Sequence, residues 1–536
     1  MCRLCDAGSP QDHSEARRQF LKATTAAGVS AAGLNLLAPR EASAHEGRAP
    51  EDSGRRGRRY VIRGGSVMSM DPKVGDFAQA DVLVEGKKIV AVGPSLHAGG
   101  ATEIDARGRI VMPGFIDTHH HLFETSLRSF LADGVLQNDK SGTRSGNTTY
   151  FEYILLTFAP VYRAQDVYIN ELFGSLSQLD AGVTTVHDIS QIHHSPQHSD
   201  AAIQGLIDSG RRAVFGYFES AGAAIIGSNP GNKYPDDAIR IKKEWFSSAD
   251  QLVTMVMGGE VYLPAYEKAW KIGRDLGLQV AAHILSPFNI RPTFDLLAKG
   301  KGGDSGTLGI GADNLFVHMT GMSDDGWNAV KRAGAHVSLA VPIEMNMRHG
   351  MPPILKMQSL GLEPSLSTDV ECTLTADFFT QMRATMNVQR ALVNQMILDT
   401  GLPPNPLNPW PLASSFPAGT PAPLLATDVL RYATMNGAKG LRLDDKTGSL
   451  TPGKQADIII LDAEAINVAP LNHVPGAVVS LMERSNVETV IVAGKVRKWK
   501  GRMLDLDLNR LRRQLEDSRD YIFSAAKVPR DLFRKD

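Results

Sequence analysis

One local pattern recurs along the middle of the chain: an amphipathic helix, a glycine suited to end it, and a continuous apolar strand. Repeated helix–glycine–strand units predict a parallel sheet covered by helices. Between residues 111 and 446 their number favours a closed (β/α)8 TIM barrel over an open doubly wound sheet, and no glycine-rich dinucleotide motif follows the early strands. The pattern is seen in SLSQLDAGVTTVHDI, AAIQGLIDSGRRAVFGYF, YEKAWKIGRDLGLQVAAHI, DDGWNAVKRAGAHVSLAV and PILKMQSLGLEPSLSTDV.

Short segments rich in β-branched residues flank this region on both sides. Residues 59–110 contain ADVLVEGKKIVAVG, and residues 447–501 contain VETVIVAGKVRKWKG. In each, a Gly-Lys pair divides two strand-like runs, as a hairpin turn does. Because chain ends often lie close together, the two segments predict one small β-sandwich domain. Leucines at helical spacing in residues 502–536 predict a C-terminal helical tail that docks on the core, with a contact between subunits as the alternative.

The first 44 residues predict an export signal. Arg17 and Arg18 precede an Ala-rich apolar run, and residues 42–44 have the A-x-A form of a cleavage site. Paired arginines followed by Phe-Leu-Lys are typical of a twin-arginine signal, which predicts a periplasmic or extracellular protein. A short buried helix is the alternative. Residues 45–58 are polar and predict a linker.

The near-zero net charge argues against a nucleic-acid partner. The 536 residues include 57 Lys and Arg against 58 Asp and Glu, whereas a nucleic-acid footprint is basic. The sequence has no uninterrupted apolar run of about 20 residues, so a transmembrane helix is not predicted. Beyond the signal, Cys372 is the one remaining cysteine, so an internal disulfide is not expected. The sequence therefore predicts a small-molecule substrate, and it is compatible with a homo-oligomer.

Polar residues that follow the predicted strands are the candidates for chemistry, because a barrel places its active site at the carboxyl ends of the strands. Histidine is prominent among them although the chain has only 15 histidines. The residues at strand ends are His119, His121, His187, Asp188, Glu219, His283, His318 and Asp369.

Strand alternation separates the three histidines at 119–121. Side chains two positions apart point the same way, so His119 and His121 can converge inside the barrel while His120 points away. Together with His283 and Asp369 they make a set of three nitrogens and one carboxylate. That set suits zinc or a similar divalent ion with room for a water. A hydrogen-bonded core histidine is the alternative for each residue taken singly.

The motif PGFIDTHHH at 113–121, the later histidine strands and residues 433–462 resemble the amidohydrolase superfamily, over about residues 58–500. The similarity is greatest to cytosine deaminase-like and triazine hydrolase-like enzymes. It implies a distorted (β/α)8 barrel with a small β-sandwich and one divalent ion, zinc first, with iron, manganese or cobalt as alternatives. The implied metal ligands are His119, His121, His283 and Asp369. Asp369 and His318 are the implied catalytic residues.

One position departs from the deaminases of this subgroup, which carry His-x-x-Glu on the fifth strand. Here Ser286 stands where the glutamate would be, and a serine hydroxyl cannot shuttle that proton. The sequence therefore favours hydrolysis of an amide, carbamate or urea-like C–N bond. A deaminase or dechlorinase of a nitrogen heterocycle is the first alternative, and a non-catalytic scaffold is the second. The predicted fourth strand, in the run LVTMVMGGEVYLP, has no lysine to bridge two ions, which favours a single metal.

Several further residues are weaker candidates, and ordinary packing or hydrogen bonding is the competing interpretation of each. The candidates for the substrate pocket are His187, Tyr217, Phe123, Glu344 and Ser286, with Cys372 also considered. A second histidine cluster could suggest another metal site, but a polar loop at the start of a helix explains it better. Its members are His193, His194 and His198.

Overall fold

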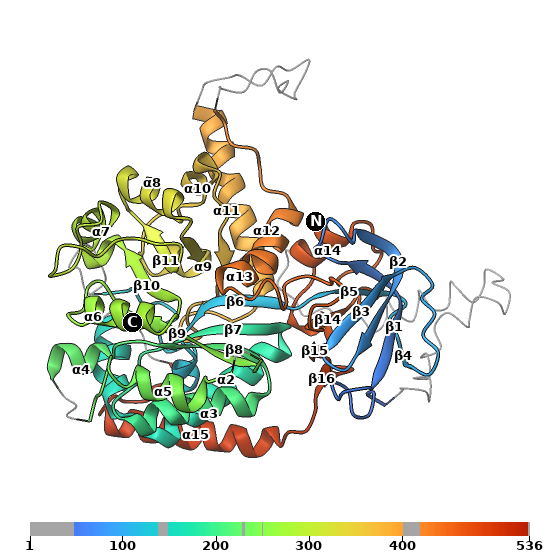
Figure 1. Cartoon of the computed structure of the whole chain (residues 1–536), viewed down its shortest axis with the longest axis horizontal. Coiled ribbons are helices and arrows are strands. Elements are labelled where there is room, and N and C mark those ends of the chain that lie inside the picture. The colour runs from blue at the N-terminus through green and yellow to red at the C-terminus, as the bar shows by residue number, and fades with distance from the viewer. Residues whose placement is uncertain (1–47, 138–147, 228–230, 249, 400–418, 534–536) are drawn as a thin grey trace, which may run out of the picture. The chain divides into compact units, whose positions relative to one another are not determined.

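The computed structural model describes residues 48–137, 148–227, 231–248, 250–399 and 419–533. Figure 1 shows the arrangement of the labelled elements. The predicted export signal at 1–44 lies outside the described residues. Among the described helices, none combines the length and the hydropathy needed to cross a membrane.

Eight parallel strands form the barrel, and each pairs with the next one along the chain. This confirms the predicted (β/α)8 class. The strands are β6 (Phe115–His120), β7 (Val183–Ser190), β8 (Arg212–Tyr217), β9 (Val253–Gly258), β10 (Val280–Leu285), β11 (Asn314–Thr320), β12 (His336–Leu339) and β13 (Ser365–Leu366).

Backbone hydrogen bonds just beyond β13 join the last strand of the barrel to the first. The Asp369 amide donates to the His119 carbonyl at 3.0 Å, and the His121 amide donates to the Asp369 carbonyl at 2.9 Å. The residues that complete the barrel are therefore the residues singled out by the metal pattern.

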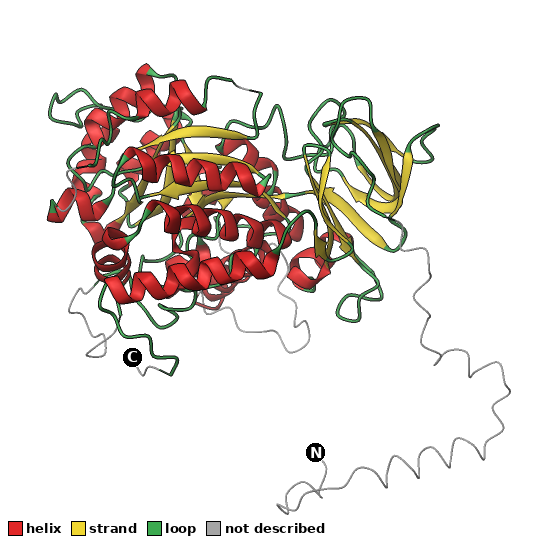
Figure 2. Ribbon diagram, turned by 90° about the horizontal axis from the view of Figure 1, so that it is seen from below, coloured by secondary structure: helices red, strands yellow, loops and turns green. Residues whose placement is uncertain are grey.

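Helices cover the outside of the barrel (Figure 2). Gly210, Gly334 and Gly361 end three of them with φ angles of 68°, 67° and 68°, the left-handed conformation that glycine adopts without cost. The α-helices of the described chain are α2 (Ala164–Asp180), α3 (Pro196–Ser209), α4 (Ala221–Ile226), α5 (Ala238–Trp245), α6 (Tyr266–Asp275), α7 (Arg291–Ala298), α8 (Asp324–Ala333), α9 (Val341–Asn346), α10 (Ile354–Leu360), α11 (Phe378–Asp399), α12 (Ala426–Ala433), α13 (Met435–Gly440), α14 (Val474–Ser480) and α15 (Leu508–Ala525). Shorter helical turns are η3 (Leu122–Leu127), η4 (Tyr150–Phe158), η5 (Ala159–Val161), η6 (Ser286–Phe288) and η8 (Arg484–Asn486).

Strands from both ends of the chain build the second sheet, as predicted. Its order is β17-β16-β15-β14-β5-β1-β2-β3, with β4 paired to β1. The hydrogen bonds make one mixed sheet, and its strands enclose a common core that includes Tyr60, Val82, Ile458 and Ile491. The strands are β1 (Arg59–Met68), β2 (Asp76–Glu85), β3 (Lys88–Gly93), β4 (Thr102–Asp105), β5 (Arg109–Pro113), β14 (Ile458–Asp462), β15 (Val487–Val492), β16 (Lys495–Trp499) and β17 (Arg502–Met503).

Two features attach the C-terminal part of the chain, from residue 457 onward, to the barrel. Arg212 on β8 and Asp457, just before β14, form an ion pair at 2.7 Å, and their side chains are 1% and 0% exposed. The C-terminal helix α15 packs against α2 and η3, burying Leu511, Leu515 and Ile522.

Candidate metal centre

The end of β6 and the residue that follows it direct two of the three consecutive histidines into the barrel. The Nε2 atoms of His119 and His121 lie 3.1 Å apart. His120 lies on the other face, where its Nδ1 atom is 2.8 Å from the Thr368 hydroxyl. The alternation of the strand thus places His119 and His121 together and keeps His120 in a separate buried contact.

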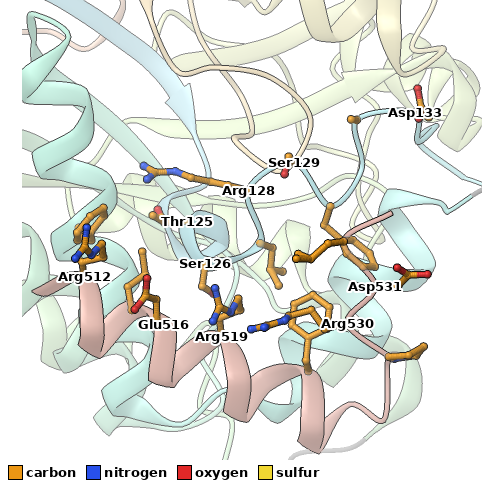
Figure 3. Close-up of a pocket in the computed structure, with 18 residues that line it drawn as sticks. Thr125, Ser126, Arg128, Ser129, Asp133, Arg512, Glu516, Arg519, Arg530 and Asp531 are labelled. Carbon is orange, nitrogen blue, oxygen red and sulfur yellow. The ribbon is translucent and has the colours of Figure 1, made fainter. Parts of the chain in front are cut away.

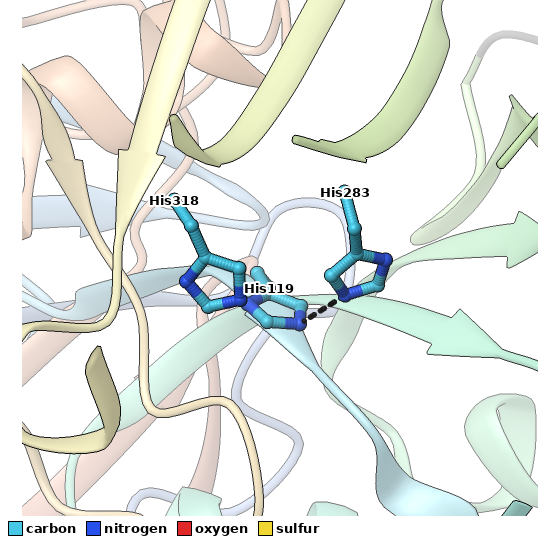
Figure 4. Close-up of side chains that lie close together, drawn as sticks. All are labelled: His119, His283 and His318. Carbon is cyan, nitrogen blue, oxygen red and sulfur yellow. Dashed lines mark hydrogen bonds between the residues drawn. The ribbon is translucent and has the colours of Figure 1, made fainter. Parts of the chain in front are cut away.

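His283 from β10 and Asp369 from the loop after β13 complete a group of four donors. His283 Nε2 lies 3.0 Å from His119 Nε2, a contact drawn in Figure 4. Asp369 Oδ1 lies 3.4 Å from His119 Nε2 and 3.8 Å from His121 Nε2. Donors about 2.0–2.1 Å from a tetrahedral zinc ion are separated by about 3.4 Å. The spacing therefore fits a divalent ion.

The protein also fixes which nitrogen of two histidines faces the centre. His121 Nδ1 donates to the Ile189 carbonyl at 2.9 Å, and His283 Nδ1 donates to Glu260 Oε1 at 2.6 Å. Each ring therefore presents the lone pair of Nε2 to the other donors. Lone pairs that face one another at about 3 Å repel unless a cation lies between them.

Burial keeps His119 and His121 neutral. It lowers the pKa of His119 and His121 well below the usual histidine value, and the neighbouring histidines lower both further. Burial is also the main reason that the pKa of Asp369 is raised well above its usual value. Neutral imidazoles are the form that binds a metal ion.

His318 on β11 lies at the edge of this group. Its Nδ1 atom is 3.1 Å from Glu344 Oε1 and its Nε2 atom is 3.5 Å from Asp369 Oδ2. Burial raises the pKa of Glu344 to about 8. His318 and Asp369 have φ angles of 71° and 63°, a costly conformation for residues other than glycine that is concentrated at functional sites.

A cavity opens beside the centre, and its lining is mostly apolar or aromatic. The polar lining comes from the histidine–aspartate group, Gln191 and His349. The lining residues are His121, Leu136, Tyr150, Leu155, Gln191, Tyr262, His283, Leu285, Phe288, His318, Met347, His349, Asp369 and Val370.

A second opening lies between α15 and the segment that follows β6 (Figure 3). Arg128, Arg512 and Arg519 contribute to its lining, together with Glu516. Neither a candidate metal ligand nor His318 lines this opening, so it is separate from the metal centre.

The five predicted pocket residues do not line the cavity beside the centre. His187 Nδ1 donates to the Thr118 carbonyl at 2.9 Å. The Tyr217 ring lies 4.6 Å from the His193 ring, and the Phe123 ring lies 6.0 Å from the His121 ring. Glu344 contacts the far nitrogen of His318. Ser286 is exposed at the start of η6.

Each member of the second histidine cluster contacts a backbone carbonyl instead of converging on a common point. The Nε2 atoms of His193, His194 and His198 lie 2.8, 2.7 and 3.0 Å from carbonyl oxygens. This arrangement agrees with the structural interpretation of the cluster.

Sequence reasoning missed Glu260 and His349. Glu260 follows the apolar run of β9, so the rule that selected the other strand-end residues could have found it. His349 lies in the loop after α9, where neither spacing nor strand periodicity marks it. Tyr150, Tyr262 and Phe288 are separated along the chain, and only the fold brings them to one cavity.

Comparison with known proteins gives a family match and several relatives. The model of the amidohydrolase family matches residues 110–407 and 411–497. A 5'-deoxyadenosine deaminase of Methanosarcina acetivorans is 25% identical over 458 residues, covering 83% of this chain and 94% of the relative. A 5-methylthioadenosine/S-adenosylhomocysteine deaminase of Symbiobacterium thermophilum is 25% identical over 465 residues, covering 82% and 93%.

Solved structures share the fold. A zinc-bound adenosine deaminase from Xanthomonas campestris superposes with a TM-score of 0.68 at 20% identity, covering 88% of this chain and all of that one. A zinc complex of atrazine chlorohydrolase from Arthrobacter aurescens gives a TM-score of 0.67 at 19% identity, covering 86% of this chain and all of the other.

Proposed function

This chain belongs to the amidohydrolase family, and from that premise we propose that it is a metal-dependent hydrolase of an amide, carbamate or urea-like C–N bond in a small organic molecule. The observation that carries the proposal is the convergence of three imidazole nitrogens and one carboxylate at 3.0–3.8 Å, beside a cavity.

We assign His119, His121, His283 and Asp369 as ligands of one divalent ion, with zinc as the first candidate. The neutral imidazoles of His119 and His121, the Nδ1–H contacts that fix the rings of His121 and His283, and the donor spacing all suit zinc. When bound, such an ion supplies an activated water at neutral pH by lowering the pKa of that water to about 7.

In this proposal Asp369 transfers protons and His318 stabilises developing charge. Asp369 accepts the proton of the attacking water and delivers it to the leaving nitrogen. Glu344 contacts His318 Nδ1 and holds the ring so that Nε2 faces Asp369. In that position His318 steadies the charge that develops on the attacked group.

Deamination or dechlorination of a nitrogen heterocycle is the second candidate function. It is favoured by the names of the relatives, which include nucleoside deaminases and a chlorohydrolase. It is disfavoured by Ser286, which lies outside the cavity lining and leaves the glutamate of the deaminases without a replacement at that position.

A metal assay followed by a substrate screen tests both functions. The zinc-loaded protein is incubated with amides, carbamates, ureas, lactams and heterocyclic amines. Release of an amine or ammonia together with a carboxylate or carbon dioxide, or opening of a lactam ring, supports the first function. Replacement of a ring amino group or chlorine by oxygen, with release of ammonia or chloride, supports the second. A protein that binds no metal, and whose stability is the same after His119→Ala, would be a non-catalytic scaffold.

Export through the twin-arginine pathway is a separate proposal and rests on Arg17, Arg18 and the A-x-A pattern. Replacing both arginines with lysine is expected to retain the protein in the cytoplasm. Cell fractionation with an antibody to the mature chain measures this, and unchanged export of the double variant contradicts the proposal.

A further inference from the structure

His349 is a buried histidine whose ring nitrogens have no protein partner. Its side chain is 4% exposed, it lines the cavity beside the metal centre, and neither Nδ1 nor Nε2 makes a hydrogen bond within the described chain. Buried polar atoms are nearly always paired. Two unpaired nitrogens on a residue that lines a cavity therefore indicate a partner that binds there.

The backbone holds His349 in place on both sides. Arg348 has a φ angle of 61° and Gly350 one of 118°. The His349 ring meets the His318 ring edge-on at 4.6 Å between centroids. The positive φ angle of Arg348 costs free energy and is retained where the surrounding structure demands it, whereas glycine adopts such an angle without a side-chain clash. His349 is therefore fixed beside His318 rather than placed in a freely moving loop.

The rest of the cavity offers a candidate ligand mainly apolar surface. The rings of Tyr262 and Phe288 lie 4.6 Å apart. The Tyr150 hydroxyl donates to Glu124 at 2.6 Å, so that tyrosine's polar end is already occupied. Among the described lining residues, Asp369 carries the sole acidic side chain and none is Lys or Arg. A charged group placed against the apolar part of the wall, away from the proposed ion and Asp369, would lose its hydration without a partner of opposite sign.

Resting on the proposed hydrolase function, we infer that His349 hydrogen-bonds the substrate, and that this substrate is an uncharged molecule with a flat apolar or aromatic body. A neutral imidazole offers one donor and one acceptor, which matches the carbonyl and the N–H of an amide-like group. His349 lies next to His318, so its hydrogen bond orients that group at the reacting end of the cavity.

A binding experiment tests the inference without a known substrate. Benzohydroxamic acid, an aromatic metal chelator with no charged group on its ring, is titrated into the cobalt-loaded protein and followed in the visible spectrum of the ion. We expect His349→Leu to weaken its binding about tenfold, the effect of one lost hydrogen bond in a buried site, and His349→Asn to restore part of it. Met345→Leu changes an exposed side chain of α9 outside the cavity lining and is expected to bind normally.

The charged analogue 4-carboxybenzohydroxamic acid tests the substrate class and is expected to bind at least about tenfold more weakly than the parent probe. Equal binding of the two probes, or equal binding of the parent probe to wild type and His349→Leu, overturns the inference. Loss of cobalt in His349→Leu also overturns it, because the residue would then be a ligand in the group His318, His349 and Asp369. A wild-type protein that takes up no cobalt instead contradicts the proposed function.

Discussion

Carboxylates behind the histidines of the centre orient them. Glu260 receives both the ring Nδ1–H and the backbone N–H of His283, at 2.6 and 3.1 Å. Glu344 Oε1 lies 3.1 Å from His318 Nδ1 and also accepts the Ala340 backbone N–H at 2.9 Å. A carboxylate that holds a ligating histidine fixes the ring and increases its basicity, so Glu260 contributes to metal affinity without touching the ion. Glu344 instead orients His318, which is outside the proposed ligand set.

We expect Glu260→Gln to lower the affinity for zinc about 10- to 100-fold, because the amide is a weaker acceptor for His283 Nδ1–H. Competition with a chelator of known affinity measures the change. Glu344→Gln is the matched control: it is expected to leave zinc affinity unchanged and to lower turnover of the substrate found in the screen. Equal losses of zinc affinity in the two variants would contradict the assignment of His318 outside the ligand set.

Glu124 predicts a pH dependence of stability. It is completely buried, and burial raises its pKa from 4.5 to about 8. The folded state therefore holds one more proton than the unfolded state between these values. Its contribution to the free energy of unfolding is fully present below pH 4.5 and is lost as the pH rises to about 8, by at most about 1.4 kcal/mol per pH unit.

Glu124→Gln keeps an acceptor for the Tyr150 hydroxyl and removes the titration. Urea unfolding of both metal-free proteins from pH 5 to pH 8 measures the difference. The stability of wild type relative to the variant should fall across this range. A constant difference would show that Glu124 is ionised in the folded state.

At the scale of elements, α15 covers the barrel through one face. Ile522 is 0% exposed, whereas Leu508 on the same helix is 44% exposed. The helical spacing of apolar residues in the tail predicted a docked helix, and the helix does pack on α2 and η3. The spacing alone did not show that Leu508 would lie on the solvent side.

We expect Ile522→Ala to reduce the free energy of unfolding by about 2–4 kcal/mol, through lost burial and the cavity left behind. Leu508→Ala on the same helix should change it by less than about 0.5 kcal/mol. Denaturant unfolding measures both. Similar values for the two variants would mean that α15 does not depend on this packing.

At the scale of the whole molecule, the Arg212–Asp457 pair couples the barrel to the second sheet. Asp457 also accepts the Ala493 backbone N–H at 2.7 Å, so both of its oxygens are used. Removing one partner of a buried ion pair leaves the other charge without compensation. Loss of this ion pair would consequently destabilise both the barrel and the second sheet.

Asp457→Ala is expected to lower the free energy of unfolding by about 3–5 kcal/mol. The exposed pair Lys271–Asp275 on α6 provides a control, and Asp275→Asn there should change stability by no more than the experimental error. Calorimetry of the metal-free proteins measures both. A small effect of Asp457→Ala would show that the Arg212–Asp457 ion pair is not needed to stabilise the barrel and the second sheet.

The barrel class, the two-ended β domain and the geometry of His119 and His121 could be predicted from sequence, because each follows from a short-range period. Helix and strand periods reveal buried faces, and alternation separates His120 from its neighbours. The cavity could not be predicted. Its residues come from separate segments: Tyr262 and His349 lie in different loops, and Phe288 lies in η6. No helix or strand period relates them, because only the closed barrel brings them together.

The hydrogen bonds between Asp369 and the end of β6 have a consequence for biosynthesis. His119 and His121 leave the ribosome early, whereas Asp369 emerges only after most of the barrel has been made. Because the backbone of Asp369 completes the barrel, the proposed ligand set exists only in a finished fold. A bound ion would therefore mark a correctly folded molecule, and a nascent or truncated chain would have no complete site with which to capture one.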